Sequence, residues 1–260
     1  MSAVVDYLVD PESWSGPRGL GNRLVEHVGI SALALLLAVV VAVPVGLWLG
    51  HLGRGGFVAL NIGGFGRAVP TFALLVVFVL LPAPFGANLQ SFVLALALFT
   101  VPPLLTNTWT GVREADRAAV DAGRGLGMSG WQLLRRVELP LATPLMMSGL
   151  RLAAVQVVAT TTVIGLVGGG SLGRIINQGF VRQDQAQVVV GAVLVALLAL
   201  ATELGLGVVE RRAARRSSGR SRSQEQDDEV EDEQGGRASG PRPGAEAERG
   251  SERAVGFPSA

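Results

Sequence analysis

The sequence predicts an all-α integral membrane protein with about five transmembrane helices, and three observations support this fold class. Of the 260 residues, 49% are apolar and only 17% are charged, and the mean hydropathy is +0.42, which is hydrophobic for a soluble domain. The apolar residues form blocks long enough to cross roughly 30 Å of hydrocarbon as helices. A charged stretch, 111–140, interrupts these blocks. It must lie outside the bilayer, because one charge near the bilayer centre costs roughly 3 kcal/mol or more.

The N-terminal segment, residues 1–27, is expected outside the membrane. It carries acidic residues and prolines before any long apolar run. A secretory signal would need a basic start followed promptly by an apolar core, so no signal is expected. The first span is predicted at the apolar block 28–50, where Pro44 favours a kink and Trp48 suits the membrane interface.

Two further spans lead to the charged stretch. The second is predicted at about 60–82, with a start that is interrupted by several glycines and by Arg67. The third is predicted at 89–109, with Pro102 and Pro103 inside it. A turn rich in proline and glycine separates the two.

Two more spans follow the charged stretch. The fourth is predicted at 144–167, and Arg151 lies close enough to its start for the long side chain to reach the interface. A substrate role for Arg151 is the alternative. A glycine-rich hinge is expected around Leu172–Phe180; its G-G-G-x-x-G pattern lacks the strand–turn–helix context of a dinucleotide site. The fifth span is predicted at 186–209, with Glu203 as its only ionisable residue.

The first half of the charged stretch has the pattern of a short helix that ends in a glycine turn. Four of its residues recur at helical spacing and would form one stripe: Ala115, Ala119, Ala122 and Leu126. Gly125 and Gly127 supply flexible backbone where this helix should stop.

The second half predicts another short helix on the same membrane surface. Ser129 followed by Gln132 indicates a capping box at its start. Leu139-Pro140 is expected to end it. Three apolar residues would share one face: Trp131, Leu134 and Val137.

The positions of the arginines predict the orientation of the chain in the membrane. One face would receive most of them, from Arg54, Arg67, the charged stretch and the cluster at 211–216. The opposite face would receive Arg18, Arg23, Arg174 and Arg182. Because arginine-rich loops stay in the cytoplasm, the charged stretch and the C-terminus are expected there and the N-terminus outside. Five spans satisfy both ends.

The C-terminal region, 210–260, combines this basic cluster with a polar tail. From Ser217 onward the composition is dominated by Ser, Gly, Glu, Asp, Arg and Pro, with an acidic run at 225–233. Such a tail has little to bury and is expected to be disordered in the cytoplasm. A regulatory role is the alternative.

Missing residue types argue against several function classes. The chain has no cysteine, and its two histidines, His27 and His51, lie about one span apart and are expected at the interfaces, so neither a metal site nor a catalytic residue is predicted. All 22 basic residues are arginine. A P-loop needs a lysine to reach the terminal phosphates of ATP, so this chain is not expected to be an ATPase. A transport subunit rather than an enzyme is the prediction. The net charge of +1 gives no reason to expect a nucleic-acid partner.

The spacing within the charged stretch resembles the EAA loop, E-A-A-x3-G-x9-I-x-L-P, of permease subunits of binding-protein-dependent ABC importers. The matching residues are Asp121, Ala122, Gly123, Gly127, Val137, Leu139 and Pro140. Asp replaces Glu, Gly replaces the second Ala, and Val replaces Ile. In that family the loop forms coupling helices that seat in a groove of the ATP-hydrolysing subunit. The resemblance therefore implies a coupling role for these residues and for Trp131.

The resemblance covers about residues 24–209 and implies the type I ABC importer permease arrangement. The flanking spans look like the branch that serves osmoprotectants such as glycine betaine, carnitine and choline. Permeases for methionine or other amino acids are similar in layout and are the first alternative. An ion-driven secondary transporter is another, although such carriers usually place ionisable residues in mid-membrane. A membrane scaffold and a membrane enzyme are further alternatives.

The resemblance also implies the partners of this chain. They are a cytoplasmic ATPase subunit that binds ATP and Mg, an extracytoplasmic substrate-binding protein, and a second permease subunit, either the same chain or a relative, in a bacterial cell membrane. The chain itself is expected to hold no cofactor, and its substrate-binding residues are left unassigned. Selectivity is expected in the binding protein, where an aromatic cage could hold a quaternary ammonium group.

Overall fold

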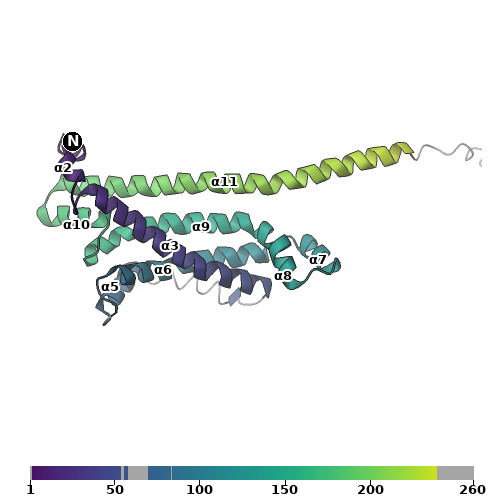
Figure 1. Ribbon diagram of the computed structural model, residues 1–260, viewed down its shortest axis with the longest axis horizontal. Coiled ribbons are helices and arrows are strands. Elements are labelled where there is room, and N and C mark those ends of the chain that lie inside the picture. Colours follow the sequence, from purple (N-terminus) through teal and green to yellow (C-terminus); the bar gives the residue numbers. More distant parts are fainter. Residues whose placement is uncertain (1, 54–55, 58–69, 83, 239–260) are drawn as a thin grey trace, which may run out of the picture. The chain divides into compact units, whose positions relative to one another are not determined.

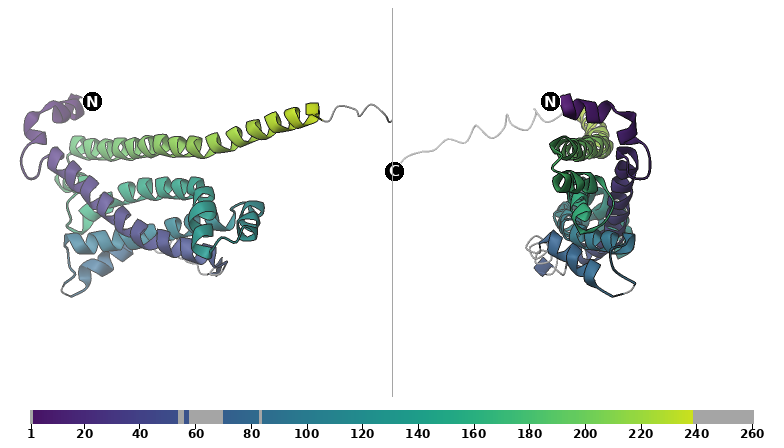
Figure 2. Two further views of the ribbon diagram at one scale, coloured as in Figure 1. Left: turned by 45° about the vertical axis from the view of Figure 1, so that its right-hand side comes forward. Right: turned by 90° about the vertical axis from the view of Figure 1, so that its left-hand side faces the viewer.

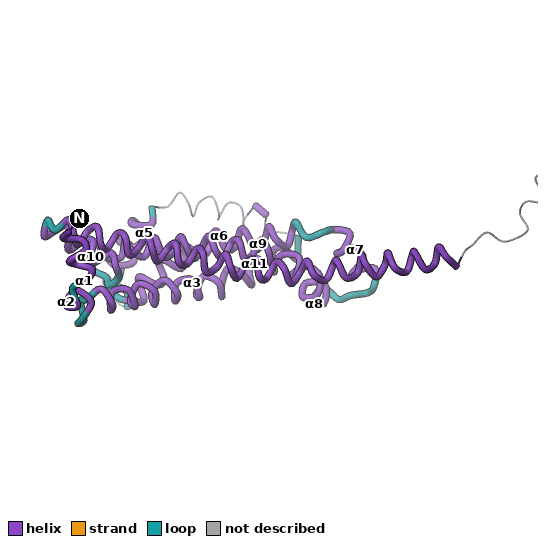
Figure 3. Tube along the Cα trace, turned by 90° about the horizontal axis from the view of Figure 1, so that it is seen from above, coloured by secondary structure: helices purple, strands orange, loops and turns teal. Residues whose placement is uncertain are grey.

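The computed structural model describes residues 2–53, 56–57, 70–82 and 84–238. All regular structure in these residues is helical and none is strand (Figure 3), which confirms the prediction of a helical protein. Four helices of the described part are long and apolar enough to cross a membrane: Leu20–His51, Leu89–Arg113, Gly130–Val167 and Gln185–Arg212.

The helices are labelled in chain order in Figure 1. The bounds are α1 Ser2–Val9, α2 Pro11–Trp14, α3 Leu20–His51, α5 Thr71–Leu80, α6 Leu89–Arg113, α7 Arg117–Gly125, α8 Gly130–Leu133, η1 Leu134–Glu138, α9 Leu139–Thr161, η2 Thr162–Val167, α10 Leu172–Arg182 and α11 Gln185–Ala238. Chain segments up to Ala213 form one compact unit, in which α3 crosses and contacts both α6 and α9 (Figures 1 and 2).

The second predicted span, 60–82, is described only in its second half. There α5 forms a ten-residue apolar helix, which is shorter than a membrane crossing. Its Leu75 is buried together with Phe92 of α6 and Ile164 of η2, so α5 belongs to the bundle core. Residues 58–69, including Arg67, lie outside the described residues, and a fifth span stays a prediction.

The contact between α3 and α6 follows a repeat of small residues. Every fourth residue along α3 is buried: Ile30, Ala34, Ala38, Ala42, Gly46 and Gly50. A side-chain carbon added at Gly46 would lie 2.8 Å from Cβ of Thr108, and one at Gly50 would lie 2.7 Å from Cβ of Val112. The two backbones therefore approach more closely than larger residues would allow, which is how helices associate where lipid offers no hydrophobic driving force.

The N-terminal helices cover one end of this unit. Tyr7 and Leu8 of α1 pack against a buried cluster formed by Leu20 of α3, Ile175 of α10 and Val190 of α11. This packing joins the N-terminal segment to α3. The helix α3 begins at Leu20, eight residues before the predicted start of the first span at residue 28.

The tail differs from its prediction in secondary structure. Disorder was expected from Ser217, whereas α11 is helical to Ala238. No proline occurs between Ser217 and Ala238, and the Arg, Glu and Gln residues of this stretch have high helix propensity, although Ser, Asp and Gly are equally frequent in it. Pro241 and Pro243, which would stop a helix, come only afterwards. Residues 239–260 lie outside the described residues.

The packing of α3 on α6 generates a first prediction. Gly46→Leu should lower the free energy of unfolding by about 1–3 kcal/mol, because the new side chain meets Thr108 where no space exists. Gly29→Leu is the matched control on the same helix, because nothing lies within 4 Å of an added carbon there. Thermal unfolding of the detergent-solubilised chain measures both, and equal melting temperatures for the two variants would contradict the packing.

Candidate functional site

The charged stretch forms two short helices at one end of the bundle, as predicted (Figures 1 and 2). The side chain of Asp116 caps α7 by accepting a hydrogen bond from the N–H of Ala118 at 2.9 Å. Gly127, just after α7, has φ +75°, a conformation that suits glycine far better than other residues. Ser129 and Gln132 form the expected capping box at the start of α8. These local predictions are confirmed.

The second helix does not end at Leu139-Pro140, so that prediction is wrong. The chain runs from α8 through the π-helical segment η1 into α9, and Pro140 lies in the first turn of α9. In an unbroken α-helix the proline ring would clash with the carbonyl of Arg136, which would also lack its donor. The wider turn of η1, in which the Leu139 N–H bonds to the carbonyl of Leu134, lets the helix continue through the proline.

The two short helices pack on each other at Gly123. A side-chain carbon at this position would lie 2.9 Å from Cδ1 of Leu133 and 3.5 Å from Cγ2 of Val137. Leu133 is almost fully buried as a result. Gly123 is the position at which the EAA pattern has its second alanine, so this departure from the pattern gives room for Leu133. Two residues of the predicted site, Gly123 and Val137, thus meet at this contact, while Ala122 is exposed.

The tip of the loop exposes large apolar side chains. Leu126 is 78% exposed and Trp131 is 65% exposed. The guanidinium of Arg135 lies 5.5 Å from the centre of the Trp131 ring, a cation–π contact. Asp121 is exposed as well and pairs with Arg124 at 3.5 Å. We call Asp121, Arg124, Leu126, Trp131 and Arg135 the loop tip.

The two apolar faces that the spacing predicts do not form as continuous buried faces. In the first, Ala115 is buried but precedes α7, and Leu126 is exposed beyond its end. In the second, Trp131 is exposed while Leu134 and Val137 are half-buried. The first stripe is interrupted because α7 spans only Arg117–Gly125, which leaves Ala115 and Leu126 outside the helix. The second is interrupted because η1 changes the helical period from Leu134 onward, so spacing at 3.6 residues per turn no longer places its side chains together.

A side-chain hydrogen bond that the sequence does not predict joins the base of the loop to α3. Nδ1 of His51 lies 2.6 Å from Oε2 of Glu138, whose side chain is only 6% exposed. His51 was expected as an isolated interfacial residue. Glu138 is the only acidic residue between Asp121 and Asp184, but it lies 87 residues from His51, so no local pattern in the sequence identifies the pair.

His27, towards the other end of α3, is fully buried within the protein, and its position at a membrane interface stays a prediction. The backbone N–H of Leu172 donates to its Nδ1 at 3.4 Å, which leaves Nε2 to donate to the carbonyl of Val158 at 2.8 Å. Both ring nitrogens are therefore satisfied in the neutral ring. His27 ties α3 to α9 and to the start of α10.

The predicted glycine-rich hinge includes residues 168–170, Ser171, Gly173 and Gly179. Its first part, up to Ser171, forms a tight turn, whereas Gly173 and Gly179 lie within α10. Gly168 has φ +89° and Ser171 has φ +79°, the latter an uncommon conformation for a residue with a side chain. The buried hydroxyl of Ser171 donates a hydrogen bond to the carbonyl of Thr161. The backbone N–H of Ser171 donates to the carboxylate of Glu26, on α3, at 3.2 Å. These contacts hold the strained backbone in place.

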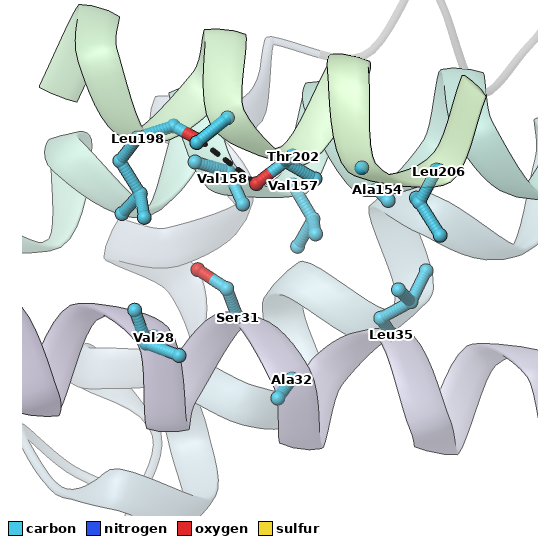
Figure 4. Close-up of a pocket in the computed structure, with 12 residues that line it drawn as sticks. Val28, Ser31, Ala32, Leu35, Ala154, Val157, Val158, Leu198, Thr202 and Leu206 are labelled. Carbon is cyan, nitrogen blue, oxygen red and sulfur yellow. Dashed lines mark hydrogen bonds between the residues drawn. The ribbon is translucent and has the colours of Figure 1, made fainter. Parts of the chain in front are cut away.

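A groove of about 350 Å³ lies between α3, α9 and α11 (Figure 4). Its walls are almost entirely apolar, and its hydroxyls are engaged locally: Ser31 with Thr161 at 2.9 Å, and Thr202 with the carbonyl of Leu198 at 2.9 Å. No aromatic side chain lines it. The groove therefore offers neither a cage for a quaternary ammonium group nor a free charge for a carboxylate.

The sequence predicted that the Arg151 side chain reaches the membrane interface without a protein partner, but in the structure it has two partners. It pairs with Glu203 and, at 2.9 Å, with Glu210, both on α11. These three residues join α9 to α11 and leave the arginine occupied by protein carboxylates rather than open to a substrate. In the described part of the chain, no group of His, Cys, Asp and Glu is arranged to hold a metal ion.

Comparisons with known proteins agree on one family. Residues 42–215 match the family described as "Binding-protein-dependent transport system inner membrane component". The chain is 33% identical over 187 residues, covering 72% of this chain and 85% of the relative, to the glycine betaine/carnitine/choline transport system permease protein OpuCB of Bacillus subtilis (strain 168). It is 35% identical over 188 residues, with coverage of 72% and 84%, to the carnitine transport permease protein OpuCB of Listeria monocytogenes.

Solved structures share the fold at lower identity. The inward-facing MetNI methionine ABC transporter aligns with a TM-score of 0.68 and 22% identity, covering 75% of this chain and 95% of that chain. An amino acid ABC transporter with histidines aligns with a TM-score of 0.61 and 19% identity, with coverage of 74% and 92%.

The contact at Gly123 generates a second prediction. Gly123→Val should destabilise the loop by about 1–3 kcal/mol through the clash with Leu133. Trypsin should then cut faster within the loop; because the chain has no lysine, all cleavage sites are arginines. Gly125→Val is the matched control, because it lies on the same helix with nothing within 4 Å of the added carbon. Unchanged cleavage of Gly123→Val would show that α7 and α8 do not depend on this contact.

Proposed function

Because the chain belongs to the family of binding-protein-dependent transport system inner membrane components, we propose that it is the permease subunit of an ATP-driven importer for a compatible solute such as glycine betaine, choline or carnitine. The solute class rests on one observation: identity of 33–35% over most of the length of relatives whose names give these solutes. The likeness to a methionine transporter, at 22% identity, supports the fold alone. Because permeases for methionine and other amino acids share this fold, such a solute is the second candidate, but the similarity to their structures lies below 25% identity.

The loop tip is the surface that would receive the ATPase subunit. Exposed apolar side chains beside arginines are typical of protein interfaces, where aromatic residues and arginine carry most of the binding energy. Leu126 and Trp131 supply the apolar area, and Arg135 the charge. The absence of lysine supports the division of roles, since this chain cannot form a P-loop and ATP hydrolysis must come from a partner.

A second permease subunit would complete the pathway. Only 11% of the apolar stretch of α11 is buried within the chain, so most of this helix faces lipid or a partner. The small residues and the apolar groove between α3, α9 and α11 would allow close helix approach at such an interface. Solute would then cross by rocking of two permease subunits, with access alternating between the two membrane faces.

Orientation and selectivity follow from the same proposal. The arginine distribution favours a cytoplasmic loop tip and an extracytoplasmic N-terminus. Since the groove lacks aromatic side chains, recognition of a quaternary ammonium group is assigned to the extracytoplasmic binding protein.

Transport by the reconstituted complex should require ATP and the binding protein and should survive collapse of the proton gradient. The reason is that the energy would come from hydrolysis on the partner subunit. The measurement is uptake of radiolabelled glycine betaine, choline and methionine into proteoliposomes, with and without an ionophore. Uptake by this chain alone that an ionophore abolishes would favour an ion-driven carrier, and a preference for methionine would favour the second candidate.

Gly127 offers a direct test of coupling. Gly127→Val should leave the chain in the membrane but weaken co-purification of the ATPase subunit, because a β-branched residue at φ +75° costs about 1–2 kcal/mol and redirects α8 and Trp131. Gly127→Asn, which tolerates this conformation, is the matched control. Asp121→Ala should weaken assembly less, since its pair with Arg124 is exposed. Normal assembly and uptake in Gly127→Val would remove the support for a coupling role of the loop.

A further inference from the structure

The pair formed by His51 and Glu138 lies behind the loop tip, away from the surface that would meet the ATPase. His51 is the last residue of α3, and Glu138 is the last residue of η1, at the junction with α9. Their side chains meet at 2.6 Å and are 21% and 6% exposed. A pair with this little exposure holds its geometry better than a surface ion pair, because both groups are largely removed from water.

The end of α3 is fixed before it reaches the loop. Gly50, one residue before His51, packs so closely on α6 that an added carbon would lie 2.7 Å from Cβ of Val112. The backbone at His51 is therefore held against α6 by the neighbouring Gly50, and the imidazole of His51 extends from there to Glu138 of η1. The pair connects three helices that are distant in sequence: α6 through Gly50, α3 through His51, and the start of α9 through Glu138.

The imidazole also contacts the start of α8. A side-chain carbon added at Gly130, the first residue of α8, would lie 3.1 Å from Nε2 of His51. The ring thus lies against both ends of the α8–η1 segment, with Glu138 at one end and Gly130 at the other. Trp131 of the loop tip follows Gly130 directly, so the position of the ring constrains the direction of the exposed surface.

We propose that His51 and Glu138 are a positioning pair that fixes the α8–η1 segment to α3, so that force on the loop tip moves α3 and α9 together. This role rests on the proposed function, in which the ATPase acts on the loop tip. Without the pair, the α8–η1 segment would have no direct link to α3, and its movement would reach α3 only through the packing of α3 on α6 and α9. Assembly with the ATPase would persist while transport per ATP would fall.

The test measures solute imported per ATP hydrolysed by the reconstituted full complex. His51→Ala and Glu138→Ala should each lower this ratio by about tenfold, within the usual range of coupling between sites, with the ATPase still bound. The double variant should be no worse than either single one, because both remove the same contact. His51→Gln, which retains a donor for Glu138, should keep most of the ratio. Leu52→Ala, at the neighbouring half-exposed position, is the control.

A cross-link gives an independent result, including where an alanine variant fails to reach the membrane. The chain has no cysteine, so His51→Cys combined with Glu138→Cys supplies its only two thiols for a bifunctional maleimide. This double variant lacks the pair and should import less solute per ATP. Cross-linking should restore the ratio, and a ratio that stays low or a block of transport would overturn the proposal. Additive losses in the double variant, or unchanged ratios in the single ones, would overturn it as well. If the unmodified complex shows no ATP-driven uptake, the proposed function fails instead.

Discussion

The close contact between α3 and α6 is the constraint on which the other interactions of the bundle depend. Small residues at every fourth position of α3 bring the two backbones together, and this fixes both ends of a helix that is long enough to cross the membrane. With α3 in place, His27 reaches the carbonyl of Val158 at one end and His51 reaches Glu138 at the other. Both histidines therefore connect α3 to the segment that contains α9, although neither lies near it in sequence.

The features that could be predicted from the sequence are those set by local rules. Gly127 and the Ser129–Gln132 capping box follow from backbone conformation and hydrogen bonding within a few residues, and the apolar helices follow from hydropathy. The pair of His51 and Glu138 could not be predicted, because the two residues are 87 positions apart in the sequence and meet only through the packing of their helices. The predicted helix end at Pro140 was wrong because proline usually stops a helix. Here the π-helical turn before Pro140 removes the clash between its ring and the carbonyl of the preceding turn.

The two ends of α9 are held in different ways. At the loop end, η1 absorbs the proline and Glu138 is anchored by His51. At the other end, the helix tightens into η2, and the strained turn at Ser171 is held by Glu26 and Thr161. A backbone in an uncommon conformation persists only where its surroundings fix it, so the contacts from α3 and α9 determine the path of the chain into α10. Because Glu26 of α3 and Thr161 of α9 both bond to Ser171, α3 and α9 are tied together at this end as well, so a joint movement of the two helices would carry the turn and α10 with it.

The distribution of polar groups argues that this chain supplies a path and its movement rather than recognition. The hydroxyls that line the groove bond within the protein, and Arg151 is occupied by Glu203 and Glu210. A site for a zwitterionic solute would need unpaired donors or an aromatic cage, and the groove has neither. Weak interaction with the solute suits a pathway, because a tight site inside the membrane would slow release. At the loop tip, exposed apolar side chains lie beside exposed charges, Leu126 and Trp131 with Arg135, and there the chain would meet another protein.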